Sequence, residues 1–416
     1  MLFRSFPRPA WTYENRLLLI LFMTFGFVFF DRLALSFLFP FMAAELHLTN
    51  AQLGMVSSAL ALTWALSGAA TGAWSDARGT RKPLLIAAVL GFSVFSALSG
   101  FVGGFASLIA FRALMGIAEG PVLPLSQSLM IESSTPSRRG LNMGLLQGSA
   151  AGLLGAMIGP PVVIGIATAA GWREAFYVSC IPGIAIAFCI WRWVHEAPPG
   201  GAIDARADAC SATKDTAKGA TVSRWALLKA RNVLLCVLIS CFFLTWFVVV
   251  ISFAPTFLVS SRHFSASDMG VVMTCLGAAW VFWGFAVPAI SDRIGRKPTF
   301  VIYQLGSVAT VIAYAQLSNP TAMLWAGALM GMFVNGMVGG YGTLMSEGYP
   351  TAARATAQNV LWNIGRAIGG LGPMTVGALA ARYSFQTAIA LLAGLYVLDM
   401  VATVFLIPEL KGVELE

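Results

Sequence analysis

Long apolar runs joined by short polar connections dominate the chain. About twelve windows are long and apolar enough to cross a hydrocarbon core of roughly 30 Å as helices of about 20 residues. They cover residues 16–43, 52–75, 83–103, 106–131, 140–167, 174–194, 232–258, 267–290, 299–318, 321–346, 355–381 and 385–407. The pattern predicts an all-α membrane protein with twelve transmembrane helices.

A short polar sequence occurs twice. Asp76-Ala-Arg78-Gly79-Thr-Arg81-Lys lies between the second and third windows, and Asp292-Arg293-Ile-Gly295-Arg296-Lys lies 216 positions further along. This repeat indicates the duplication of an ancestral half of about six helices, an arrangement typical of secondary transporters. We therefore expect two pseudo-symmetric six-helix bundles. The predicted divisions are a cytosolic segment (1–15), an N-terminal bundle (16–195), a cytosolic linker (196–231), a C-terminal bundle (232–408) and a cytosolic tail (409–416).

Composition excludes a soluble globule. Hydrophobic residues make up 58% of the chain, charged residues 11%, and the mean hydropathy is +0.78, against roughly a quarter charged in soluble domains. The polar stretch after His195, which opens with prolines and glycines, has too little apolar content to pack and reads as the linker. The six cysteines lie mostly inside apolar windows without metal-ligand spacing, so we expect no metal site.

The positions of the basic residues predict the topology. Only Arg173, Arg262 and Arg382 fall on one side of the membrane. The other side carries a group between 192 and 231 together with Arg4, Arg8, Arg16, Arg78, Arg81, Lys82, Arg138, Arg139, Arg293, Arg296, Lys297, Arg354 and Lys411. By the positive-inside rule we expect both termini to be cytosolic. No cleavage-type signal peptide is visible at the N-terminus, so we expect the first helix to be an uncleaved anchor. The net charge of +8 is then a topology signal and requires no nucleic-acid partner.

The duplicated loop resembles a motif of the major facilitator superfamily, Gly-x-Leu-Ala-Asp-Arg-x-Gly-Arg-Arg. The first copy runs from Gly72 through Asp76 to Arg81, with Ala77 and Thr80 as departures, and the second copy has Pro288 where the glycine would be. Aspartate at a helix end can pair with neighbouring arginines, and glycine permits the tight turn, so the loop could act as a cytosolic gate. The alternative is that these charges only mark a membrane edge. The gate residues would be Gly72, Asp76, Arg78, Gly79, Arg81, Asp292, Arg293, Gly295 and Arg296.

Two further segments resemble the same family. The run from Arg112 to Gly120 is similar to its helix 4 motif, and the glycines from Gly148 to Gly159, followed by Pro160, are similar to its helix 5 motif. Glycine lets helices approach closely, and proline inside a helix permits a bend. Gly159 and Pro160 are therefore candidate bending residues. Packing and gating roles for the glycines are compatible.

Six ionisable residues lie deep inside predicted helices, where a charge costs at least about 2.5 kcal/mol on insertion scales. Neighbours on helix 1, Asp31 and Arg32, point about 100° apart, so one could face a central cavity while the other meets a second helix. Arg112 and Glu119 are seven residues apart and share one face of helix 4. The remaining two are Arg366 and Asp399, the latter with a structural or lipid-edge role.

These charges suit the transport of an organic anion. An arginine fork can bind both oxygens of a carboxylate, and a carboxylate beside it can carry a proton. The alternative is that Arg32 or Arg112 only neutralises Asp31 or Glu119 as a structural pair. We expect no catalytic residues, because no nucleophile and base arrangement, metal cluster or phosphate loop is visible.

The arrangement resembles the anion:cation symporter branch of the superfamily, which moves organic anions such as sugar acids. The resemblance implies substrate contact by Arg32 and proton coupling by Asp31 and Glu119, with Arg112 as the charge partner on helix 4. Trp64 and Gly68 replace a tyrosine and a glutamine of that branch, which changes the cavity wall.

The second half resembles sialate, monocarboxylate and aromatic-acid proton symporters. The resemblance is carried by residues 354–366 and by the ending Pro408-Glu-Leu-Lys411-Gly. Asn359, Asn363 and Arg366 recur at helical spacing and could complete a cavity opposite Gln147. Substrate contacts are therefore assigned to Arg32, Gln147, Asn363 and Arg366.

The sequence thus predicts a monomeric, proton-coupled symporter of a small organic anion in the bacterial cytoplasmic membrane, with no cofactor. A proton-driven exporter of lipophilic compounds is the main alternative, and two deep arginines disfavour a cationic substrate. A sensor or enzyme on a transporter scaffold is the remaining alternative.

Overall fold

The computed structural model describes residues 12–78, 80–135, 138–196, 231–338 and 364–406. Within these ranges the chain is helical, and ten helices are long and apolar enough to cross a membrane. The windows 321–346 and 355–381 run into residues outside the described ranges, so the count of twelve and the cytosolic placement of the termini stay predictions. The all-α membrane fold is confirmed.

The N-terminal half begins with α1, whose first turn is capped by the Thr12 hydroxyl accepting from the backbone N–H of Asn15 at 3.4 Å. Its α-helices are α1 (Tyr13–Glu45), α2 (Asn50–Arg78), α3 (Lys82–Leu98), α4 (Phe105–Glu119), α5 (Val122–Ser133), α6 (Arg139–Gly144), α7 (Gly159–Ala169) and α8 (Trp172–Trp193). A short 3-10 turn, Ser99–Phe101, follows α3, and α4 and α5 together form one membrane span.

The C-terminal half contains α11 (Arg231–Ser260), α12 (Ala266–Ile294), α13 (Arg296–Gln316), α14 (Pro320–Met330), α17 (Gly372–Arg382) and α18 (Phe385–Leu406). Residues 364–369 form a further helical turn before α17. Asn319 caps α14 by accepting from the backbone N–H groups of Thr321 and Ala322, and Pro320 occupies the first helical position.

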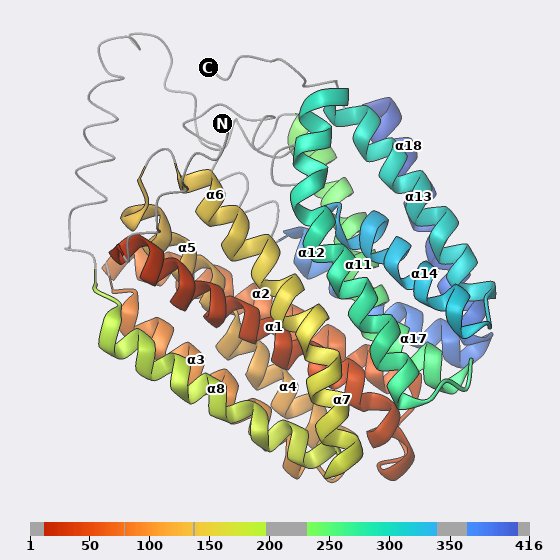
Figure 1. The fold of residues 1–416 in the computed structure, drawn as a ribbon, viewed down its shortest axis with the longest axis horizontal. Coiled ribbons are helices and arrows are strands. Elements are labelled where there is room, and N and C mark those ends of the chain that lie inside the picture. Colours follow the sequence, from red (N-terminus) through yellow and green to blue (C-terminus); the bar gives the residue numbers. More distant parts are fainter. Residues whose placement is uncertain (1–11, 79, 136–137, 197–230, 339–363, 407–416) are drawn as a thin grey trace, which may run out of the picture.

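Figure 1 shows the two halves as separate groups of helices, the first coloured red to yellow-green and the second green to blue. Within the first group α2 packs on α4 and α3 packs on α8, and within the second α18 packs on α11 and α13. The halves meet where α2 crosses α17 and where α12 crosses the segment that precedes α7. A site between the halves is therefore bounded by helices from both.

Glycines permit the close crossings between the halves. A Cβ on Gly54 of α2 would lie 2.2 Å from the Pro373 carbonyl oxygen of α17, and one on Gly277 of α12 would lie 2.2 Å from the Ala156 carbonyl. The Gly54 crossing lies near the start of α2 and the end of α1, which the charge pattern assigns to the extracytosolic side. At that end the backbones of the two halves touch.

Candidate functional site

A cavity of about 70 Å³ lies between the halves. Helices α1, α2, α11 and α12, the segment before α7 and the turn at 364–369 all contribute to its wall. Most of the wall is aromatic or aliphatic, including Phe25, Phe29, Trp64, Phe243, Phe247 and Trp280. The polar lining side chains among the described residues are Arg32, Ser36, Ser57, Gln147, Ser252 and Arg366. Such a cavity can hold a small molecule at the interface of the two bundles.

Two arginines of this cavity face the same indole ring. The Arg32 guanidinium carbon of α1 lies 4.7 Å from the centre of the Trp64 ring, and that of Arg366 lies 4.1 Å from it. Arg32 also lies 5.8 Å from the Phe29 ring centre. Cation–π attraction of this kind stabilises a guanidinium in a largely apolar wall. The tryptophan at position 64 therefore supports both cations, a role that the sequence comparison with the symporter branch left unassigned.

Asp31 points away from the cavity into the N-terminal bundle. Its side chain is fully buried and lies beside Ser96 of α3 and Ser179 of α8, whose hydroxyls are 2.9 Å apart. Arg112 is also fully buried, and its Nη1 donates to the Asp31 carbonyl oxygen at 3.3 Å. The neighbouring residues Asp31 and Arg32 thus serve different environments, because helical geometry turns them about 100° apart.

Glu119 ends α4 between these two environments. It is fully buried and interacts electrostatically with Arg32, Asp31 and Arg112. Neither of its carboxylate oxygens has a hydrogen-bond partner within the described part of the chain. The buried acids and arginines of α1 and α4 therefore form one electrostatic cluster, and Arg32 is its member in the cavity wall. The sequence did not single out Ser96 and Ser179, because a lone serine in an apolar helix carries no distinguishing signal.

Gln147 is the polar cavity residue from the segment that precedes α7. Its amide oxygen accepts from Nε2 of Gln127 on α5 at 3.2 Å, which fixes its orientation. Asn359 and Asn363 lie outside the described residues, so their predicted places opposite Gln147 stay predictions. Gly68 packs against Gly120, since a Cβ there would lie 2.8 Å from the Gly120 carbonyl oxygen. A glutamine at 68 would not fit this crossing of α2 and α4.

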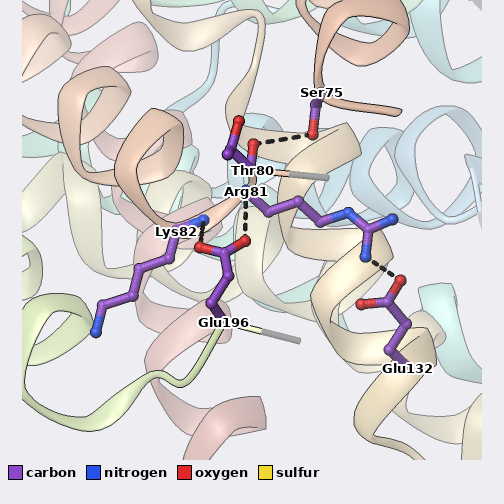
Figure 2. A network of polar contacts seen from close by, with 6 residues as sticks. All are labelled: Ser75, Thr80, Arg81, Lys82, Glu132 and Glu196. Atoms are coloured by element: carbon purple, nitrogen blue, oxygen red, sulfur yellow. Dashed lines mark hydrogen bonds and ion pairs between the residues drawn. The ribbon is translucent and has the colours of Figure 1, made fainter. Parts of the chain in front are cut away.

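The first copy of the duplicated loop is tied to other parts of the N-terminal half (Figure 2). Arg81 forms an ion pair with Glu132 of α5. Its backbone N–H and that of Lys82 donate to the Glu196 carboxylate at 2.6 and 2.9 Å. Neither Glu132 nor Glu196 was recognised from the sequence, because each lies far along the chain from the motif.

The remaining first-copy residues are less fully described. Gly72 lies in α2 with the Pro124 side chain 3.9 Å from an added Cβ. The side chains of Asp76 and Arg78, and Gly79 altogether, lie outside the described parts, so the gate role of this loop stays a prediction.

In the second copy, Gly295 alone separates α12 from α13. Its φ of +110° belongs to the region that favours glycine, so it makes the turn between two helices in a single residue. Arg296 pairs with Asp292 at 2.6 Å and donates to Ser291 Oγ at 2.9 Å. Arg293 lies in the last turn of α12.

The glycine-rich membrane span Leu141–Ala169 contains two kinds of helical winding. Its segments Leu145–Ser149 and Ala151–Ile158 are π-helical, and α7 begins at Gly159 with Pro160 in its first turn. A Cβ on Gly155 would lie 2.8 Å from Cβ of Phe29, so glycine brings this helix against α1. At Gly159 the winding changes from π-helical back to regular α-helical.

Asp399 belongs to a polar cluster inside the C-terminal bundle. It is fully buried, its carbonyl accepts from the Thr403 hydroxyl at 2.9 Å, and Thr403 in turn accepts from Gln304 Nε2 at 2.9 Å. The lipid-edge role considered for Asp399 is therefore wrong. This side of α18 packs against α13, so the Asp399 side chain lies between helices.

Comparison with known proteins identifies the family. Residues 21–371 match the family model of the Major Facilitator Superfamily. A protein of Haemophilus influenzae that is named a metabolite transport protein is 39% identical over 94% of this chain and 95% of its own length. The hexuronate transporter of Bacillus subtilis is 26% identical over 96% of both chains.

A solved structure agrees on the fold. The crystal structure of a D-xylose-proton symporter superposes with a TM-score of 0.77 at 19% identity, over 96% of this chain and 99% of that one. The chain therefore belongs to the Major Facilitator Superfamily, and it is a multi-pass transporter of the bacterial cytoplasmic membrane rather than an enzyme.

Proposed function

We propose that this transporter imports a small organic anion together with protons by alternating access. The observation that carries the proposal is the place of Arg32, which lines the central cavity while its charge interacts with buried Glu119. Relatives of the chain are named as transporters of hexuronate, D-galactonate and cis,cis-muconate, all of which are organic acids. These names support an organic acid as the substrate.

Competition for Arg32 provides the coupling in this proposal. When Glu119 is ionised, its charge balances Arg32, and a substrate carboxylate gains little by binding. When Glu119 holds a proton, Arg32 is free to bind both oxygens of the substrate carboxylate. An ionised carboxylate that is buried without hydrogen bonds is costly, so substrate binding at Arg32 favours a proton on Glu119. Proton and substrate therefore bind together.

Asp31 is the second acid in the proposed coupling. It faces Arg112 and two serines instead of the cavity, so it cannot touch the substrate. Protonation of Asp31 would affect Arg32 through the α1 backbone that carries both residues, because Arg112 donates to the Asp31 carbonyl oxygen. In this proposal Arg112 positions α1, and Glu119 exchanges partners with the substrate.

Reconstituted proteoliposomes test the proposal with two variants. Arg32→Ala should abolish uptake of the organic anion, and Glu119→Gln should retain exchange of internal for external substrate while losing accumulation driven by a pH gradient. Glu174→Gln, which alters an exposed acid at the start of α8, is the matched control and should keep both activities. Intact uptake by Arg32→Ala would refute the substrate role, and equal loss of exchange and accumulation by Glu119→Gln would remove Glu119 from coupling.

The aromatic wall also fits a proton-driven exporter of lipophilic compounds. The same vesicles distinguish the two functions, because an exporter would move neutral lipophilic dyes and would not depend on Arg32. Dye transport that persists in Arg32→Ala would favour the exporter.

A further inference from the structure

The side-chain amide of Gln147 is held by a second glutamine. Gln147 lines the central cavity, whereas Gln127 lies on α5 and does not line it. Nε2 of Gln127 donates to Oε1 of Gln147 at 3.2 Å. An amide group is planar, and its oxygen and its nitrogen point in different directions from the terminal carbon. With the oxygen turned toward Gln127, the nitrogen with its two N–H groups is the end that remains for the cavity.

The backbone that carries Gln147 also departs from a regular helix. Gln147 is the central residue of the π-helical segment Leu145–Ser149. Such turns are rare and frequently occur at functional sites. A π turn contains more residues than an α turn, so it changes the direction in which a side chain leaves the helix. The place of this amide therefore depends on both its backbone and its glutamine neighbour.

The direction of the amide decides what it can do for an anion. The oxygens of an ionised carboxylate only accept hydrogen bonds, so they attract the N–H groups of an amide and repel its carbonyl oxygen. A glutamine amide without a partner can present either end. A neutral hydrogen bond such as that from Gln127 Nε2 favours one orientation by about two- to tenfold. The orientation that it favours here is the one that donates to the cavity.

We propose that Gln127 is a positioning residue of the substrate site, which holds the Gln147 amide so that its N–H groups donate to the anion. This inference rests on the proposed function, since it names a further residue that shapes the same site. Arg32 and Gln147 line one cavity, and both then present hydrogen-bond donors from the N-terminal half. Gln127 does not contact the substrate, so its effect on transport passes through Gln147.

Uptake by reconstituted proteoliposomes tests the inference. The probes are D-glucuronate, which is a hexuronate, D-galactonate and cis,cis-muconate, because relatives are named as transporters of such acids. The measured quantity is KM for the probe that the wild type takes up best, since KM does not depend on how much of a variant is folded. The maximal rate is recorded beside it.

Two substitutions of Gln127 should differ in their effect. Gln127→Leu leaves the Gln147 amide without its donor, so KM should rise only about two- to threefold. Gln127→Glu supplies a carboxylate that only accepts, which draws the Gln147 N–H groups away from the cavity and turns the carbonyl oxygen toward the anion. KM should then rise at least about tenfold, because a hydrogen bond to a charged group contributes at least that factor. The maximal rates should change less than KM.

A negative charge at position 127 could also repel the anion directly, and a double-mutant cycle separates the two effects. In a Gln147→Leu background, Gln127→Glu should raise KM by less than about twofold, because the residue through which it acts is gone. Gln316→Glu makes the same substitution at the exposed end of α13, and this control should keep the wild-type KM.

The outcomes separate this inference from the proposed function. With uptake by the wild type intact, an unchanged KM in Gln127→Glu would overturn the inference. A larger rise of KM in Gln127→Leu than in Gln127→Glu would overturn it in favour of a packing role. An equal effect of Gln127→Glu with and without Gln147 would overturn it in favour of direct repulsion. If wild-type vesicles take up none of the three acids, the proposed function fails, and the inference fails with it.

Discussion

Replacement of Gly54 by alanine should open the extracytosolic end of the transporter. A Cβ at this position would lie 2.2 Å from the Pro373 carbonyl oxygen and 2.8 Å from its carbon. Real Cβ atoms essentially never lie within 3.0 Å of another heavy atom of this kind. The helices α2 and α17 must therefore separate locally by about 0.8 Å, the difference between 3.0 and 2.2 Å. The obstacle is backbone, which cannot rotate aside as a side chain can. Separation of the helices is therefore the available response.

The energetic effect follows from overpacking, which costs about 1–3 kcal/mol at a well-packed site. A state in which α2 and α17 are already apart does not bear this cost. The population of the closed form relative to the open form should then fall by about 5- to 150-fold, because about 1.4 kcal/mol corresponds to a factor of ten. A protein that is mostly closed would become a measurable mixture.

Distance measurement by electron spin resonance provides the assay. Spin labels at Thr49 and Ala381, on a background without native cysteines, report on the two halves, because both residues line one cavity at this end. Gly54→Ala should add a population at longer distance. Gly165→Ala in α7, where a new Cβ meets nothing within 4 Å, is the control and should leave the distribution unchanged. An unchanged distribution in Gly54→Ala would refute the reasoning that this crossing holds the end closed.

Two further predictions concern packing inside the bundles, and both are measured by thermal unfolding in detergent. Gly183→Ala should destabilise the N-terminal bundle by about 1–3 kcal/mol, because the new Cβ would lie 1.8 Å from Ser93 Oγ and 2.7 Å from Ser93 Cβ. Adding Ser93→Gly should restore stability. Failure of that rescue would contradict the steric explanation. Thr403→Val should cost about 1–3 kcal/mol, because it leaves the buried Gln304 amide without its acceptor, and Thr403→Val combined with Gln304→Leu should cost less than Thr403→Val alone. Equal costs would show that the hydrogen bond contributes nothing.

Sequence reasoning was strongest where apolar length decides the structure. The windows 16–43 and 174–194 correspond to α1 (Tyr13–Glu45) and α8 (Trp172–Trp193) within a few residues. A lipid-exposed backbone must satisfy its own hydrogen bonds, so a long apolar run has little choice but a helix. The family was likewise identifiable, because its loop motif and glycine pattern are local in the chain.

Local winding was less accessible. The sequence indicated a bend near Gly159, but it did not indicate that residues 145–149 and 151–158 would be π-helical. This segment packs against α1 and α12, which bring Phe29 and Trp280 to its glycines. No period in the sequence of helix 5 itself carries that information.

By itself the sequence determined the membrane fold, the duplication and which side chains were costly enough to matter. Those properties follow from local quantities, namely the length of an apolar run, the spacing of motifs and the free-energy cost of placing a charge in lipid. Tertiary structure decided how the deep charges divide. Asp31 and Arg112 lie inside one bundle, whereas Arg32 and Arg366, 334 positions apart, meet at Trp64 between the two. The approach of residues so distant in the chain depends on how two separately folded bundles pack together, which no local pattern encodes.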